Sequence, residues 1–94
     1  MNQILKKIKK KDTEKIILNI VKRVLKKDIS VNYKFLKHGV DSLGMIRIIL
    51  QIENILEKKY QLQTNLSENI SKVDSKRIFE TPKSIIRFIN KKLD

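Results

Sequence analysis

Apolar residues recur along this chain at the three- and four-residue spacing that is typical of amphipathic helices. The first such segment covers residues 12–28, where aliphatic side chains fill one broad face and mostly polar side chains the other. Asp12 or Thr13 is predicted to cap its start, because a side-chain oxygen there can accept a hydrogen bond from an unpaired backbone N–H. The predicted apolar face consists of Ile16, Ile17, Ile20, Val21, Val24 and Leu25.

Residues 29–41 show no regular apolar period and are predicted to form a long ordered loop. Val31, Phe35 and Leu36 are the side chains expected to anchor this loop to the core. A loop of this length in a compact domain usually either has a function or is disordered. The segment is therefore a candidate for a functional role.

The strongest helical pattern covers residues 42–59, with Asp41 or Ser42 as its predicted N-cap. Its core-facing stripe is predicted to consist of Met45, Ile48, Ile49, Ile52, Ile55 and Leu56. At about 100° per residue, a second apolar group lies about 150° away from that stripe. This smaller group consists of Leu43, Ile46 and Leu50. A helix with two apolar faces is expected to bury one and to present the other.

The remainder of the chain predicts one further main helix. Residues 60–74 are polar and mixed, and a short helix is expected near residues 75–79. Thr81 is the predicted N-cap of the last helix, with Pro82 at the first helical position, where its missing N–H costs nothing. The side chains expected to pin these segments to the core are Leu62, Leu66, Ile70, Val73, Ile85, Ile86, Ile89 and Leu93.

The predicted fold class is therefore all-α, a small bundle of three main helices and one short helix with a long loop between the first two. A chain of 94 residues is long enough for one domain. We assign residues 12–94 to the bundle and residues 1–11, which contain five lysines, to a basic N-terminal extension.

Composition excludes several kinds of chemistry. There is no Cys, which rules out disulfides, thiolate metal sites and a Cys nucleophile, and the single His argues against a multi-His zinc site. Two Gly residues are too few for a glycine-rich phosphate-binding loop. Ser42 and His38 are four residues apart, and no third side chain is spaced to orient His38 as a general base, so we predict no catalytic residues. The missing Cys and the single His lead us to predict no metal site.

The formal net charge of +12 invites a polyanion or an anionic membrane as a partner. A basic nucleic-acid-binding helical domain is therefore an alternative function, although only four of the basic residues are Arg and no helix is rich in them. Residues 1–11 could attach weakly to a membrane surface. No apolar run could span a bilayer or act as a secretory signal, so we expect a cytoplasmic location. We also expect the chain to be a monomer.

Ser42 is the residue that the sequence singles out for chemistry. A helix N-terminus presents free N–H groups and the positive end of the helix dipole, so a phosphate attached there would be stabilised. The simpler alternative is that Ser42 only caps the helix, since Ser is a favoured N-cap residue. Position alone favours the capping role, and the pattern of residues around Ser42 changes that balance.

The stretch around Ser42, FLKHGVDSL from Phe35 to Leu43, resembles the attachment motif of acyl carrier and peptidyl carrier proteins. That motif has an apolar anchor followed by Gly, a variable residue, Asp, Ser and Leu. The preceding helix, the apolar-rich helix after it, and the Phe79 to Pro82 entry into an Ile-rich helix match the family's layout. The resemblance covers roughly residues 12–93.

The resemblance implies a four-helix bundle in which Ser42 receives 4′-phosphopantetheine from coenzyme A through a separate Mg-dependent phosphopantetheinyl transferase. The thiol of this arm would hold an acyl or aminoacyl group as a thioester, and the chain itself would not be an enzyme. Asp41 is the flanking motif residue. Partner enzymes that load the cargo or act on it downstream would contact Leu43, Ile46, Arg47 and Leu50.

Three features depart from the family pattern. His38 stands where Leu or an aromatic residue is commoner, and its role is either solvent-facing or a contact to the phosphate. Gly44 and Arg47 replace residues that are often acidic in fatty-acid carriers, and the net charge is opposite to that of most carriers. The charge argues against a typical fatty-acid synthase. The Gly-Val-Asp-Ser sequence at residues 39–42 is also similar to that of polyketide and nonribosomal peptide carriers, which favours a specialised or secondary-metabolite pathway.

Overall fold

The computed structural model describes residues 10–69 and 75–93, and these residues form helices and connecting segments without a β-strand. The predicted all-α bundle is confirmed. The elements in chain order are α1 (Lys10–Leu25), the 3₁₀ helix η1 (Leu36–His38), α2 (Ser42–Tyr60), the 3₁₀ helix η2 (Leu66–Asn69), α3 (Ser75–Ile78) and α4 (Pro82–Lys92).

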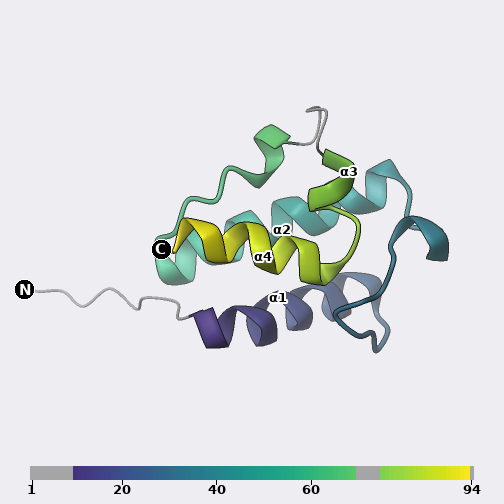
Figure 1. Ribbon diagram of the computed structural model, residues 1–94, viewed down its shortest axis with the longest axis horizontal. Coiled ribbons are helices and arrows are strands. Elements are labelled where there is room, and N and C mark those ends of the chain that lie inside the picture. Colours follow the sequence, from purple (N-terminus) through teal and green to yellow (C-terminus); the bar gives the residue numbers. More distant parts are fainter. Residues whose placement is uncertain (1–9, 70–74, 94) are drawn as a thin grey trace, which may run out of the picture.

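The three long helices pack around one aliphatic core. In Figure 1, α1 lies along one side of the bundle, and α4 lies in front of α2. α1 contacts both α2 and α4, and α3 contacts α4. The predicted core stripes are confirmed in their centres, whereas their edges are half-buried, namely Ile16, Val24, Leu25, Met45, Ile55 and Leu93. The buried core consists of Ile17, Ile20, Val21, Ile29, Phe35, Ile48, Ile49, Ile52, Leu56, Leu66, Ile85, Ile86 and Ile89.

The first helix begins and ends earlier than predicted. α1 starts at Lys10, so Thr13 is a buried residue inside the helix, and the prediction that Asp12 or Thr13 caps it is wrong. It ends at Leu25, because Lys26 adopts a left-handed conformation with φ of 56°. The N–H of Lys27 then donates to the carbonyl of Lys22 at 3.3 Å, which closes the helix in a Schellman motif.

The start of α4 is confirmed as predicted. The Thr81 hydroxyl accepts a hydrogen bond from the N–H of Ser84 at 3.1 Å, and the Ser84 hydroxyl accepts one from the N–H of Thr81 at 3.0 Å. Pro82 occupies the first turn and is buried. The Ser84 hydroxyl also lies 2.6 Å from the carbonyl oxygen of Ile78, which ties the end of α3 to the start of α4.

The loop between α1 and α2 is attached to the α3–α4 corner by its backbone. The N–H of Phe35 donates to the carbonyl of Glu80 at 3.1 Å, and the N–H of Lys83 donates to the carbonyl of Val31 at 2.9 Å. Phe35 is an anchor, as predicted, and is only 1% exposed. Leu36 is 83% exposed, so its prediction as an anchor is wrong. The reason is that η1 starts at this residue and its turn directs consecutive side chains to different sides.

The segment after α2 is held by one acidic side chain. Glu53 of α2 accepts hydrogen bonds from the N–H and the hydroxyl of Ser67, at 2.9 and 3.0 Å. Leu66 beside it is fully buried, and Leu62 packs against the core. The predicted anchors Ile70 and Val73 lie outside the described residues, as does most of the basic extension. Within the described ranges, no helix is long and apolar enough to cross a bilayer.

Candidate functional site

Ser42 occupies the first position of α2, and its side chain is exposed. Of the two predicted caps, Asp41 is the one that the structure selects, because its Oδ1 accepts a hydrogen bond from the N–H of Gly44 at 2.8 Å. The Ser42 hydroxyl is therefore not needed to cap the helix. The structure thus assigns the cap to Asp41 and leaves the Ser42 side chain exposed.

The turn that leads into α2 depends on Gly39. This residue ends η1 with φ of 82°, in the left-handed region where a side chain would introduce strain. Its N–H donates to the carbonyl of Leu36 at 3.1 Å, and the N–H of Val40 donates to the carbonyl of Phe35 at 2.9 Å. These bonds turn the chain from η1 towards the start of α2, so Gly39 helps to set where Ser42 lies.

Gly44 gives the Asp41 carboxylate room to reach the helix. A Cβ at this position would lie 3.1 Å from Cγ1 of Val40 and 3.3 Å from Oδ1 of Asp41, which is tighter than ordinary packing. The absence of a side chain therefore accommodates the cap. From the sequence, Gly44 was notable only as a departure from a family pattern, because its neighbours in space were not known.

The backbone at the start of α2 favours a negative charge. The N–H groups of Ser42 and Leu43 lie in the first turn, where N–H groups have no partner within the helix. The next two N–H groups have partners in Asp41. The N–H of Gly44 donates to the Asp41 carboxylate, and the N–H of Met45 donates to the Asp41 carbonyl at 2.9 Å. A phosphate on the Ser42 oxygen would lie beside the two remaining N–H groups and the positive end of the dipole.

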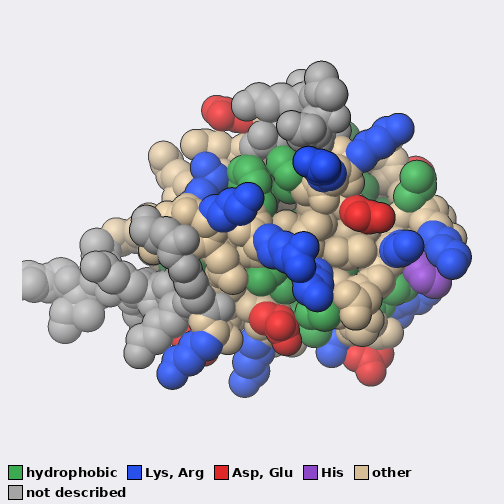
Figure 2. Space-filling view, viewed as in Figure 1, with side chains coloured by type: hydrophobic (Ala, Val, Ile, Leu, Met, Phe, Trp, Pro, Cys, Tyr) green, Lys and Arg blue, Asp and Glu red, His purple; other side chains and the backbone are tan. Residues whose placement is uncertain are grey.

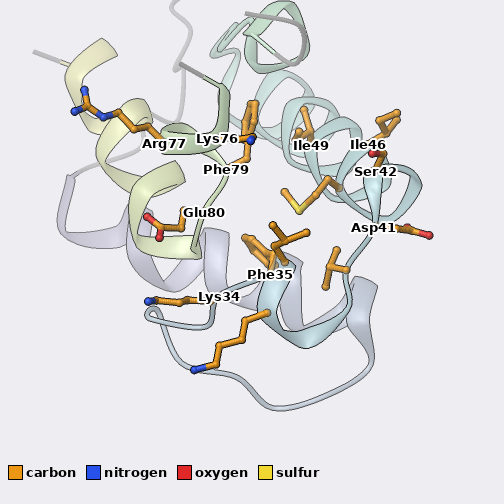
Figure 3. A pocket seen from close by; sticks show the side chains of 14 residues that line it. Lys34, Phe35, Asp41, Ser42, Ile46, Ile49, Lys76, Arg77, Phe79 and Glu80 are labelled. Carbon is orange, nitrogen blue, oxygen red and sulfur yellow. The ribbon is translucent and has the colours of Figure 1, made fainter. Parts of the chain in front are cut away.

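A cavity of about 700 Å³ opens beside Ser42, between α2, the η1 segment and the α3–α4 corner. Figure 3 shows Phe35 and Phe79 extending into this region from different segments, whereas Asp41 points away from it. Sequence analysis missed the cavity, because it forms only when segments more than thirty residues apart in the sequence meet. Its apolar lining consists of Phe35, Leu36, Val40, Met45, Ile46, Ile49 and Phe79.

The smaller apolar face of α2 is exposed, as the helical pattern predicts. Leu43 and Leu50 are 60% and 50% exposed, Ile46 is half-buried, and the Arg47 side chain between them is exposed. Arg47 and Leu50 also line a second, open hollow between α1 and α2, together with Val24, Gln51 and Asn54.

His38 is exposed and stacks on Tyr33, with the ring centroids 4.3 Å apart and the planes 13° from parallel. The stack holds the imidazole against the loop that precedes α2. In the part of the chain that the structure describes, no three His, Cys, Asp or Glu side chains come together as metal ligands would.

Comparison with known proteins gives one result that bears on this site. The model of a protein family described as "Phosphopantetheine attachment site" matches residues 15–89. The match begins inside α1 and ends inside α4, so it covers the whole of the intervening bundle. No curated protein and no solved structure matches the chain.

Proposed function

We propose, from the premise that this chain belongs to the phosphopantetheine-binding family, that Ser42 is the residue that bears its 4′-phosphopantetheine group. Membership implies that the group is attached covalently to a carrier that is modified by a separate transferase. The observation that supports Ser42 most strongly is its exposed hydroxyl at the first position of α2, with the capping task already taken by Asp41.

The other serines whose side chains the structure describes fit this role less well. Ser84 is half-buried, and its hydroxyl bonds to three backbone groups at the α3–α4 corner. Ser67 is half-buried and donates to Glu53. Ser30 is exposed, but it lies in a loop where its hydroxyl accepts from the N–H of Asn32. Ser42 combines exposure with the start of a long helix.

The residues around Ser42 fit a phosphodiester. Attachment forms a bond between the Ser42 oxygen and the diphosphate phosphorus of coenzyme A that carries pantetheine. The P–O bond between this phosphorus and the nucleotide's phosphate breaks, so that 3′,5′-ADP leaves, and the transferase accepts the hydroxyl proton. The first turn of α2 then faces the remaining phosphate charge with its N–H groups. The carboxylate of Asp41 is held by the N–H of Gly44, which fixes that negative charge on the cap.

When bound, the arm supplies the thiol on which an acyl or aminoacyl cargo is held as a thioester. This fits a chain without Cys, because the reactive sulfur arrives with the cofactor. The role of the protein is covalent anchorage and presentation. The exposed face formed by Leu43, Ile46, Arg47 and Leu50 is the contact that we assign to the transferase and to the enzymes that load or use the cargo.

The charge of the chain supports a specialised pathway. The first turn of α2 contains no acidic residue, and Arg47 is exposed in its second turn. Partner enzymes that recognise a carrier through basic patches would be repelled, since like charges that face each other across an interface are costly. We therefore place this carrier with enzymes adapted to a basic protein.

Modification of the purified chain tests the assignment of Ser42. Incubation with coenzyme A, Mg²⁺ and a broad-specificity transferase should add one phosphopantetheinyl group, measured by intact mass. The Ser42→Ala chain should remain unmodified, whereas Ser30→Ala, which removes another exposed hydroxyl, should be modified like the wild type. Equal modification of Ser42→Ala, or no modification of the wild type by several transferases, would contradict the assignment.

A further inference from the structure

The surface around Ser42 exposes leucine side chains on both sides of the serine. Leu36 in η1 is 83% exposed, and Leu43 and Leu50 on α2 are 60% and 50% exposed. These are the large hydrophobic residues that stand out as exposed in the described part of the chain. Leu43 and Leu50 are seven residues apart and so lie on one face of α2. Several large apolar side chains gathered on a surface mark a contact site for another molecule.

Basic side chains surround these leucines. Residues 42–52 contain one charged side chain, Arg47, which lies between Leu43 and Leu50 on the outer face. The next charged residue is Glu53, and its carboxylate is engaged by Ser67 of η2. The outer face of the first two turns and a half of α2 is therefore apolar and positive.

Basic residues also outnumber acidic residues at the edge of the cavity beside Ser42. Four basic residues and two acidic residues line this edge. Asp41, one of the acidic residues, points away from the cavity in Figure 3, as does the basic Arg77, and the Asp41 carboxylate is hydrogen-bonded to the N–H of Gly44. The other is Glu80, which is exposed. The basic residues are Lys34, Lys37, Lys76 and Arg77.

We propose that the basic leucine surface, defined as Leu36, Lys37, Leu43, Arg47 and Leu50, docks a partner protein whose complementary face is acidic and contains an apolar recess. The proposal rests on the carrier function above and specifies the chemistry of its partner. Complementary charge speeds the encounter and rejects partners of the wrong sign. The leucines, which become buried only when the partner docks, and Arg47 supply the contacts that hold the complex.

The exposed leucines favour a protein over a nucleic acid as the occupant. Binding to a nucleic-acid backbone depends on neutralising phosphates with Lys and Arg, and it gains nothing from three exposed leucines. Figure 2 also shows Lys and Arg side chains spread over the visible face rather than gathered in one stripe. Two features distinguish this surface from the rest of the basic exterior: Leu43 and Leu50 share a face of α2 with Arg47, and the exposed Leu36 stands next to Lys37 in η1.

The test measures docking without attachment. The Ser42→Ala chain is titrated against two purified phosphopantetheinyl transferases, one with an acidic and one with a basic carrier-binding face. The chain should bind the acidic-faced enzyme more tightly, and the difference should shrink as salt is raised. Arg47→Glu should weaken that binding by about tenfold or more and strengthen binding to the basic-faced enzyme. Leu43→Ala should weaken the first complex by about tenfold.

Arg87→Glu is the matched control, because Arg87 is an exposed residue of α4 that lines neither hollow around the surface. Equal effects of Arg47→Glu and Arg87→Glu would overturn the proposal, as would tighter binding to the basic-faced enzyme or no binding to either. The proposal would also be overturned if the chain bound duplex DNA more tightly than the acidic-faced enzyme and Leu43→Ala did not change the binding to DNA. Since docking is measured on Ser42→Ala, a failure here is distinct from a failure of Ser42 to be modified.

Discussion

The inner and outer faces of α2 are built from the same kinds of side chain and have opposite surroundings. On the inner face Ile48, Ile49 and Ile52 are at most 1% exposed, whereas Leu43 and Leu50 on the outer face are at least half exposed. Hydrophobic character alone therefore does not decide which face is buried. The difference teaches that the inner face stabilises the fold, whereas the outer face contributes little to the core and is exposed for the contact that we propose.

The largest effect is expected from breaking the inner face. Ile52 is fully buried among residues of the core, so Ile52→Ala removes packing and leaves a cavity. We expect the free energy of unfolding to fall by about 2–5 kcal/mol, measured by urea denaturation followed by circular dichroism. A loss below about 0.5 kcal/mol, the range of ordinary surface substitutions, would contradict the packing described for this face.

An intermediate effect is expected at Gly39, in the turn between η1 and the start of α2. Gly39→Ala places a side chain at φ of 82°, and we expect a loss of about 1–2 kcal/mol in the free energy of unfolding. Lys26→Gly is the matched control, because Lys26 already pays the left-handed cost at φ of 56° and should gain up to about 1 kcal/mol. Equal shifts of the same sign in both variants would show that backbone strain does not govern these positions.

The smallest effect on stability is expected from the outer face. Leu50 is half exposed, so Leu50→Ala should change the free energy of unfolding by no more than about 0.5 kcal/mol. Urea denaturation alongside Ile52→Ala gives the direct contrast between the two faces. A loss from Leu50→Ala as large as that from Ile52→Ala would place Leu50 in the core and remove the reason to treat this face as a docking surface.

For the two helices with strong sequence signals, the predicted starts agree with the structure. α2 was predicted over residues 42–59 and extends to Tyr60, and the cap of α4 at Thr81 was predicted together with Pro82. In both helices a regular apolar period agrees with a capping residue at the start. The exposure of Ser42 and of the second apolar face of α2 also agrees with what the sequence predicts.

The remainder depended on local conformations or tertiary contacts that the sequence does not encode visibly. The end of α1 was missed because Lys, rather than Gly, occupies the left-handed position at residue 26. Leu36 was expected inside because a single turn of 3₁₀ helix has no period to reveal its outward direction. The cavity beside Ser42 was missed because Phe35 and Phe79 meet only in the folded chain.

Site mapping on the modified protein tests the central claim most directly. Trypsin cleavage after Lys37 and Arg47 releases residues 38–47, in which Ser42 is the only hydroxyl-bearing residue. After incubation with coenzyme A and a transferase, fragmentation of this peptide should place one phosphopantetheinyl group on Ser42. Detection of the group on a peptide that contains another serine, with residues 38–47 unmodified, would contradict the account.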